Sequence, residues 1–192
     1  MDNLPLVIAS GNQGKIREFK KLLEDFPFDL LTQPVGFEIE ETGSTFMENA
    51  RIKAIAVSQA KGNLSLADDS GLSVEALGGA PGIYSSRYAN SDNERIQKLL
   101  DELNPFPNRK AKFECALCIA NGAKVLIEVS GLCEGLITFS PKGRNGFGYD
   151  PIFEVSGLGE TYAEMDHEKK KHIGHRGNAF KLLKPELKKL FT

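Results

Sequence analysis

The chain has 192 residues, of which 41% are hydrophobic and 26% charged, and its formal net charge at pH 7 is -2. This length suits one sizeable core, so we expect a single domain over residues 1–192. The small net charge argues against recruitment of nucleic acid or an anionic membrane by the overall field, and no apolar run reaches transmembrane length. Without a recognisable targeting segment, we expect a cytoplasmic protein.

A strand, a glycine-containing turn and a helix are predicted at the start of the chain. Residues 4–10 form an apolar strand, and residues 16–26 carry an apolar stripe at helical spacing. The turn between them reads Ser10-Gly11-Asn12-Gln13-Gly14-Lys15. A helix N-terminus at this point would direct backbone N–H groups at an anion, although an ordinary helix-capping turn would look similar. The glycine spacing excludes a Walker loop.

The next predicted elements are a short strand over residues 29–32 and a helix from Phe46 to Lys61. Thr45 and Glu48 form a capping box before this helix, and Gly62 ends it. Glu40 and Glu41 precede the helix and Lys53 lies within it. The two glutamates could add carboxylates to a cation site, or they could only favour the helix N-terminus electrostatically.

Two adjacent carboxylates follow the next apolar segment. Residues 64–67 are expected to form a buried strand that stops at Asp68 and Asp69, where Gly71 lets the chain turn. Adjacent carboxylates raise each other's proton affinity unless a cation or strong donors compensate. The pair therefore fits a Mg²⁺ and general-base site, while an Asp-Asp-Ser-Gly turn is the structural alternative.

A second capping box and a hairpin are predicted in the middle of the chain. Ser91 and Glu94 open a helix that ends near residue 104, and Asn121-Gly122 joins strands over residues 113–119 and 124–137. We expect this hairpin to be mainly structural, although it could supply dimer contacts. Cys115 and Cys118 lie on the first of these strands and point to opposite faces, so we interpret them as buried reduced thiols.

A glycine-rich loop with two aromatic residues occupies residues 142–151. Its Phe147 and Tyr149 could stack on a base, or they could simply pack on the core. A helical region is expected over residues 163–192, opened by Thr161 and Glu164 and interrupted around Gly174, Gly177 and Pro185. The three histidines in this region are poorly spaced for zinc, but His175-Arg176 at a glycine-flanked helix start is well placed to bind a ligand.

Together these segments resemble the inosine triphosphate pyrophosphatase family, the dITP/XTP pyrophosphatases. The matching motifs fall in order along the chain: residues 10–15, 40–53, 67–72, 77–84, 146–151, 161–164 and 175–176. The resemblance implies a mixed α/β fold, with an elongated central sheet and flanking helices in two lobes that enclose a substrate cleft. One departure is Gly174, where the family usually has Ser.

The resemblance also implies an activity and roles for the matching residues. It implies Mg²⁺-dependent hydrolysis of ITP, dITP and XTP to the monophosphate and pyrophosphate by a homodimer that needs no nucleic acid or membrane partner. Glu41 and Asp69 would hold Mg²⁺, and Asp69 would also accept the proton. The implied substrate contacts are Ser10, Gly11, Asn12, Gln13, Gly14, Lys15, Lys53, Ser70, Phe147, Gly148, Tyr149, Asp150, Lys170, His175 and Arg176.

Two other functions remain open from the residues alone. One is a metal-dependent nucleotide phosphatase that releases orthophosphate. The other is a non-catalytic nucleotide- or RNA-binding module that uses the basic C-terminal helices and Phe147. The paired carboxylates argue against this module, because they repel phosphate unless a cation intervenes.

Overall fold

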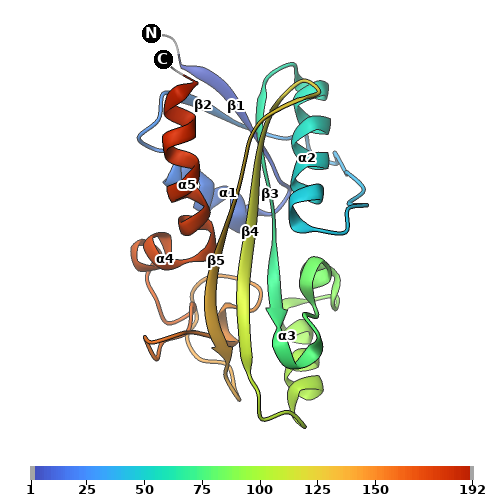
Figure 1. Ribbon diagram of the computed structural model, residues 1–192, viewed down its shortest axis with the longest axis vertical. Helices are drawn as coiled ribbons and strands as arrows, with labels where there is room; N and C mark the ends of the chain where they lie inside the picture. Colours follow the sequence, from blue (N-terminus) through green and yellow to red (C-terminus); the bar gives the residue numbers. More distant parts are fainter. Residues whose placement is uncertain (1–2, 191–192) are drawn as a thin grey trace. The chain divides into compact units, whose positions relative to one another are not determined.

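The computed structural model describes residues 3–190, which form a mixed α/β structure with one six-stranded sheet (Figure 1). The strand order is β2-β1-β3-β4-β5-β6. Strand β1 runs parallel to β2 and β3, and β6 runs antiparallel to β5. The elements are β1 (Leu4–Ala9), α1 (Gln13–Leu22), β2 (Phe28–Thr32), α2 (Phe46–Lys61), β3 (Leu64–Val74), α3 (Asp92–Leu103), β4 (Lys110–Asn121), β5 (Lys124–Ile137), β6 (Phe153–Val155), α4 (His167–Ile173) and α5 (His175–Lys189).

The chain divides into two compact units, and the divisions fall inside continuous elements. The described part of the first unit covers residues 3–69, 115–131 and 179–190, and the second covers residues 70–114 and 132–178. Strands β3, β4 and β5 and helix α5 each contribute residues to both units. Within residues 3–190, no helix is long and apolar enough to cross a membrane.

The first unit buries alternate strand residues against different helices. Leu6, Ile8 and Leu66 belong to a core cluster with side chains of α1 and α5. The strand residues that alternate with these three face α2. There the buried Ser65 hydroxyl donates a hydrogen bond to the Ala54 carbonyl at 2.5 Å. Because successive side chains of a strand point to opposite faces, each strand serves both layers.

The second unit has its own core, in which the C-terminal half of β3 meets α3. Leu72 and Val74 pack in one cluster with Leu99 and Leu103. Phe113 of β4 and the fully buried Tyr162 belong to the same cluster, and their rings stack with centroids 5.5 Å apart. This core supports the glycine-rich loop over residues 142–151.

Local signals placed most elements correctly. Both predicted capping boxes are present, α2 spans the predicted residues, and Gly62 ends it in the left-handed conformation. The hairpin is also confirmed, since β4 and β5 are neighbouring strands joined at residues 122–123. Cys115 and Cys118 lie on β4 as free, buried thiols.

The prediction that the third strand stops at Asp68 is wrong. Strand β3 continues through Asp68, Asp69, Ser70 and Gly71 to Val74, so Gly71 lies in a strand rather than a turn. Turn-forming composition is overridden here because β3 remains part of the sheet beside its neighbour β4 after its pairing with β1 ends at Ala67.

The predicted interruptions of the C-terminal helices are partly wrong. The chain does break at Gly174, but α5 continues through Gly177 and Pro185, and α4 begins after the N-cap Asp166 rather than near Thr161. A Cβ at Gly177 would lie 1.8 Å from the Lys171 carbonyl oxygen, so this glycine serves a close backbone approach. Pro185 is exposed, whereas Leu183 and Leu187 on either side of it are buried in the core and hold the helix together.

Candidate active site

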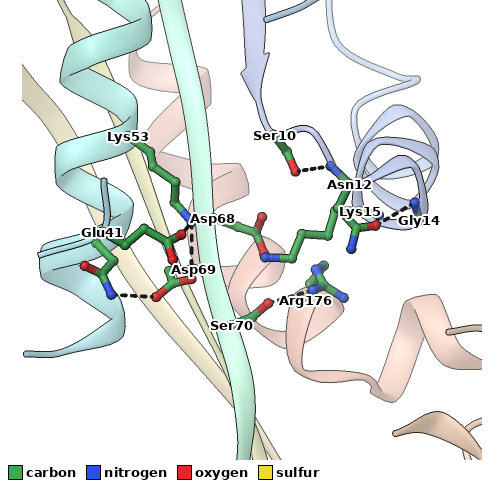
Figure 2. A network of polar contacts seen from close by, with 11 residues as sticks. Ser10, Asn12, Gly14, Lys15, Glu41, Lys53, Asp68, Asp69, Ser70 and Arg176 are labelled. Carbon is green, nitrogen blue, oxygen red and sulfur yellow. Dashed lines mark hydrogen bonds and ion pairs between the residues drawn. The ribbon is translucent and has the colours of Figure 1, made fainter. Parts of the chain in front are cut away.

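The turn between β1 and α1 is a capped helix N-terminus. The Asn12 side-chain oxygen accepts hydrogen bonds from the backbone N–H groups of Gly14 (2.8 Å) and Lys15 (3.2 Å). The Asn12 N–H donates in turn to the Ser10 hydroxyl at 3.2 Å (Figure 2). Two of the amides expected to face an anion are therefore already bonded to Asn12. The Lys15 ammonium remains as the principal cation of this turn, and it lies 3.1 Å from an Asp68 carboxylate oxygen.

Asp68 and Asp69 are neighbours in sequence but point to opposite faces of β3. Asp68 lies on the same face of β3 as Leu66 and pairs with Lys15 of α1. Asp69 lies on the same face as Ser65 and pairs with Lys53 of α2. The alternation of a strand causes this separation, which a turn would not have produced. The expectation of two carboxylates side by side is therefore corrected, because each aspartate has its own lysine.

Lys53 lies between two carboxylates at the first turns of α2. Its Nζ donates to Glu41 Oε1 at 2.6 Å and to Asp69 Oδ1 at 3.2 Å. All three side chains are at most 16% exposed. Glu41 and Asp69 thus converge on the Lys53 ammonium, and the structure brings these three predicted site residues together (Figure 2).

The electrostatics of this cluster follow from burial and from an excess of carboxylates. Burial raises the pKa of Asp69 above its ordinary value, despite the opposing attraction of Lys53 and Lys15. Burial alone would lower the pKa of Lys53, but Asp69, Asp68 and Glu41 together outweigh it and raise that pKa. The lysine therefore stays charged at neutral pH.

In the second unit, Asp150 organises the glycine-rich loop. Its Oδ2 accepts hydrogen bonds from the Lys170 ammonium at 2.6 Å and from the Phe147 N–H at 2.9 Å. A Cβ at Gly146 would lie 1.8 Å from the same oxygen, so the loop can close on Asp150 only with glycine there. The Lys170 ammonium is also 5.1 Å from the centroid of the Phe147 ring. The loop thus presents a half-buried aromatic ring beside a buried cation.

The two aromatic residues of this loop have different environments. Tyr149 is buried, and its hydroxyl donates to the Ser85 carbonyl at 3.0 Å, so its side chain packs on the core. The Gly148 N–H donates to Asp92 Oδ2 at 2.8 Å, a contact from α3 that the sequence did not indicate. Phe147 is therefore the aromatic side chain of the pair that can stack on a ligand.

His175 and Arg176 begin α5, as predicted, and both are buried. The imidazole of His175 stacks on Phe113 at a centroid distance of 4.7 Å. The Arg176 guanidinium donates to the Ser70 hydroxyl at 2.7 Å and lies 5.5 Å from the Phe147 ring centroid. The structure therefore brings Ser70, Phe147, Asp150, Lys170 and Arg176 into one polar and aromatic group of the second unit.

The whole chain is similar to proteins of one family. The sequence profile of the Ham1 family matches residues 6–186. The chain belongs to the Ham1 family. A protein of Prochlorococcus marinus (strain NATL1A) named dITP/XTP pyrophosphatase is 89% identical over 190 residues, which are 99% of this chain and 97% of the relative. A Synechococcus protein (strain CC9311) of the same name is 61% identical over 99% of this chain and 93% of its own length.

Solved Ham1 structures share the fold. The Ham1 protein of Coxiella burnetii is 42% identical and superposes with a TM-score of 0.88, over 97% of this chain and 99% of the other. The Ham1 protein of Staphylococcus aureus is 43% identical with a TM-score of 0.85, over 96% and 98% of the two chains. The predicted resemblance and the mixed α/β fold class are thereby confirmed.

The donor set of this Ham1 chain suits Mg²⁺ rather than a softer metal. No group of three or more His, Cys, Asp or Glu side chains that could hold a metal occurs within residues 3–190, so a zinc cluster is not formed there. Mg²⁺ commonly uses one or two carboxylates, with phosphates and water completing its shell. Glu41 and Asp69, which already converge on the Lys53 ammonium, provide such a pair.

Proposed function

We propose that this protein hydrolyses deaminated purine nucleoside triphosphates (ITP, dITP and XTP) to the nucleoside monophosphate and pyrophosphate. The observation that carries the proposal is the convergence of the Glu41 and Asp69 carboxylates on the Lys53 ammonium, whose side chain is only 13% exposed. Relatives up to 89% identical carry the name dITP/XTP pyrophosphatase, which supports the same activity. We therefore assign the chain to the enzymes that cleave the bond between the α- and β-phosphates.

The first group of residues would bind the triphosphate and activate water. Ser10 to Lys15 and Lys53 would hold phosphate oxygens, and Glu41 and Asp69 would hold Mg²⁺. When bound, Mg²⁺ would neutralise phosphate charge. Asp69 would orient the water and accept its proton while that water attacks the α-phosphorus. The bond from this phosphorus to the bridging oxygen breaks, and the electron pair leaves with pyrophosphate, whose charge Lys15 and Lys53 stabilise.

The second group would read the base. Hypoxanthine and xanthine carry a 6-oxo acceptor where adenine carries an amino donor. Donors from Lys170, His175 or Arg176 would satisfy the former and would face another donor in the latter. A site built from buried donors can discriminate by several powers of ten. Ser70 and the segment Phe147 to Asp150 would complete the contacts, with the Phe147 ring stacked on the base.

The remaining predictions concern the number of domains, the oligomeric state, the partners and the cellular compartment of the protein. We propose a single domain over residues 1–192, because β3, β4 and β5 each continue through both units. We further propose that the enzyme acts as a homodimer in the cytoplasm, with no nucleic acid or membrane partner. The three buried free thiols are consistent with a reducing compartment.

A product assay tests the proposed function. The purified chain is incubated with ITP, XTP, GTP or ATP, with and without Mg²⁺, and both pyrophosphate and orthophosphate are measured. We expect Mg²⁺-dependent pyrophosphate from ITP and XTP and much less from ATP. Orthophosphate as the first product would indicate a phosphatase. Tight nucleotide binding without any product would indicate a binding module, and either result would reject the proposal.

A further inference from the structure

The side chain of Asn49 connects the two segments that carry Glu41 and Asp69. Asn49 lies in the first turns of α2 and is fully buried. Its Oδ1 accepts a hydrogen bond from the Gly43 N–H at 2.8 Å, and its Nδ2 donates to Asp69 Oδ2 at 3.2 Å. One carboxamide thus reaches both the loop that follows Glu41 and the carboxylate on β3.

The polarity of these two partners specifies an amide at position 49. A backbone N–H can only donate, and an ionised carboxylate can only accept. The side chain between them must therefore accept on one side and donate on the other, within a site from which water is excluded. A carboxamide has this combination, whereas an aliphatic side chain would leave the Gly43 N–H and the Asp69 oxygen without those bonds, at a cost to stability.

The absence of a side chain at Gly43 lets the loop lie directly against this amide. A Cβ at position 43 would lie 2.7 Å from Asn49 Oδ1 and 2.6 Å from the Glu48 Cβ, which is closer than real Cβ contacts. Glu41 is only two residues away along the loop, so its position depends on this contact. On the other side of the amide, Asp69 Oδ1 receives Lys53, while Oδ2 receives Asn49. Both oxygens of Asp69 therefore have a fixed donor.

We propose that Asn49 is a positioning residue that sets the distance between Glu41 and Asp69 and the plane of the Asp69 carboxylate. This inference rests on the proposed function, because it gives Glu41 and Asp69 their joint task. The hydrogen bonds of the Asn49 side chain go to Gly43 and Asp69 rather than to the turn over residues 10–15. Its removal should therefore affect turnover more than nucleotide affinity.

The first experiment compares Asn49→Ala with Ser58→Ala on ITP. Ser58 is a matched control, because it lies on the same helix, is equally buried, and makes two hydrogen bonds, to the Asn63 carbonyl and from the Gly122 N–H. We expect Asn49→Ala to lower kcat by about 10- to 100-fold with little change in KM. Ser58→Ala should lower the thermal midpoint but retain kcat in assays far below that midpoint.

The second experiment measures metal-dependent binding without catalysis. The thermal midpoint is followed during a Mg²⁺ titration with a non-hydrolysable α,β-methylene analogue of ITP. The Mg²⁺ concentration for half-maximal stabilisation should rise about 10-fold in Asn49→Ala. Gly43→Ala should raise it as well, because its Cβ displaces the same loop, while Ser58→Ala should not.

The outcomes separate this inference from the proposed function. If Asn49→Ala does not fold, Asn49→Asp is tested instead. This variant keeps the size of the side chain and the acceptor for the Gly43 N–H but loses the amide donor to Asp69. A fall in kcat in this variant supports the positioning role of Asn49. Unchanged kcat in either variant, or an equal loss in Ser58→Ala, overturns it. A wild-type protein that releases no pyrophosphate would instead reject the proposed function.

Discussion

Replacement of Lys53 by Met should turn the cluster around Glu41 and Asp69 into a site that needs an added cation for stability. The Lys53 ammonium lies 2.6 Å from Glu41 and 3.2 Å from Asp69, and its side chain is only 13% exposed. Methionine preserves most of the aliphatic stem but removes the charge. The two carboxylates then remain close together without the cation on which they converge.

The size of the effect can be estimated from the geometry. Removal of one partner from a buried ion pair destabilises a protein by about 3–5 kcal/mol, and the slight exposure of these groups favours the lower end. For a chain of this size, roughly 3 kcal/mol corresponds to a fall of about 6–12 °C in the thermal midpoint. Millimolar Mg²⁺ should restore part of that loss, since it can take the place of the ammonium between the carboxylates.

The assay is thermal unfolding at about pH 8, where carboxylates are ionised, with and without Mg²⁺. Arg51→Met is the control, because Arg51 lies on the same helix and pairs with Glu128 at 2.6 Å but is largely exposed. We expect a smaller fall in midpoint for Arg51→Met and no response to Mg²⁺ beyond that of the wild type. An equally small Mg²⁺ response in Lys53→Met would refute the view that Glu41 and Asp69 form a cation site.

Three further predictions address catalysis, base selection and the thiols. Asp69→Asn should lower the turnover of ITP by at least about 100-fold, measured as pyrophosphate release, because it removes the positioned proton acceptor; near-normal turnover would exclude this role. Lys170→Met should reduce the ratio of kcat/KM for ITP over ATP by about 10-fold or more, because a buried donor for the 6-oxo group is lost; an unchanged ratio would assign base selection to other residues. Burial raises the pKa of Cys118 to about 12, and the other two cysteines are also buried. A thiol reagent should therefore leave all three cysteines unlabelled in the native protein at about pH 8 and label them after unfolding. Fast labelling of the native protein would contradict the structure.

Elements with a complete local signal were predictable from the sequence. The boundaries of α2 follow from Thr45, Glu48 and Gly62. The side chains of Thr45 and Glu48 accept hydrogen bonds from backbone N–H groups at the start of the helix, and Gly62 ends it in the left-handed conformation. The hairpin follows equally from Asn121-Gly122, because Gly122 adopts a positive φ. In these cases the residues that decide the structure are within a few positions of one another.

Elements decided by distant partners were not predictable in this way. The segment Asp68 to Gly71 has the composition of a turn, yet it lies in the middle of strand β3, which continues in the sheet beside β4 after its pairing with β1 ends at Ala67. Pro185 would end an isolated helix, but the burial of Leu183 and Leu187 holds α5 together. Local propensity is a weak guide wherever tertiary contacts of this kind compete with it.

In the candidate site, too, some residues were predictable from the sequence and others depend on distant contacts. The motifs identified Glu41, Lys53 and Asp69 as one group, and the structure places them together. The roles of Asn49 and Asp92 depend on contacts with residues 20 and 56 positions away, to Asp69 and Gly148 respectively, and no spacing rule indicates such contacts. The position of Asn49 directly after Glu48 of the capping box is a sequence signal that could have drawn attention to the first of them.

The charges of the first unit give an independent argument for a divalent cation. Lys15 and Lys53 face three carboxylates, those of Asp68, Glu41 and Asp69, so the cluster carries one net negative charge when all five groups are ionised. A triphosphate is itself strongly anionic, and like charges at close range oppose binding. Strand alternation keeps Asp68 with Lys15 and leaves Asp69 with Glu41, so the surplus carboxylate lies on the α2 side. A cation bound there would reverse the sign of the cluster at the point where the proposed chemistry needs both a carboxylate base and a place for phosphate.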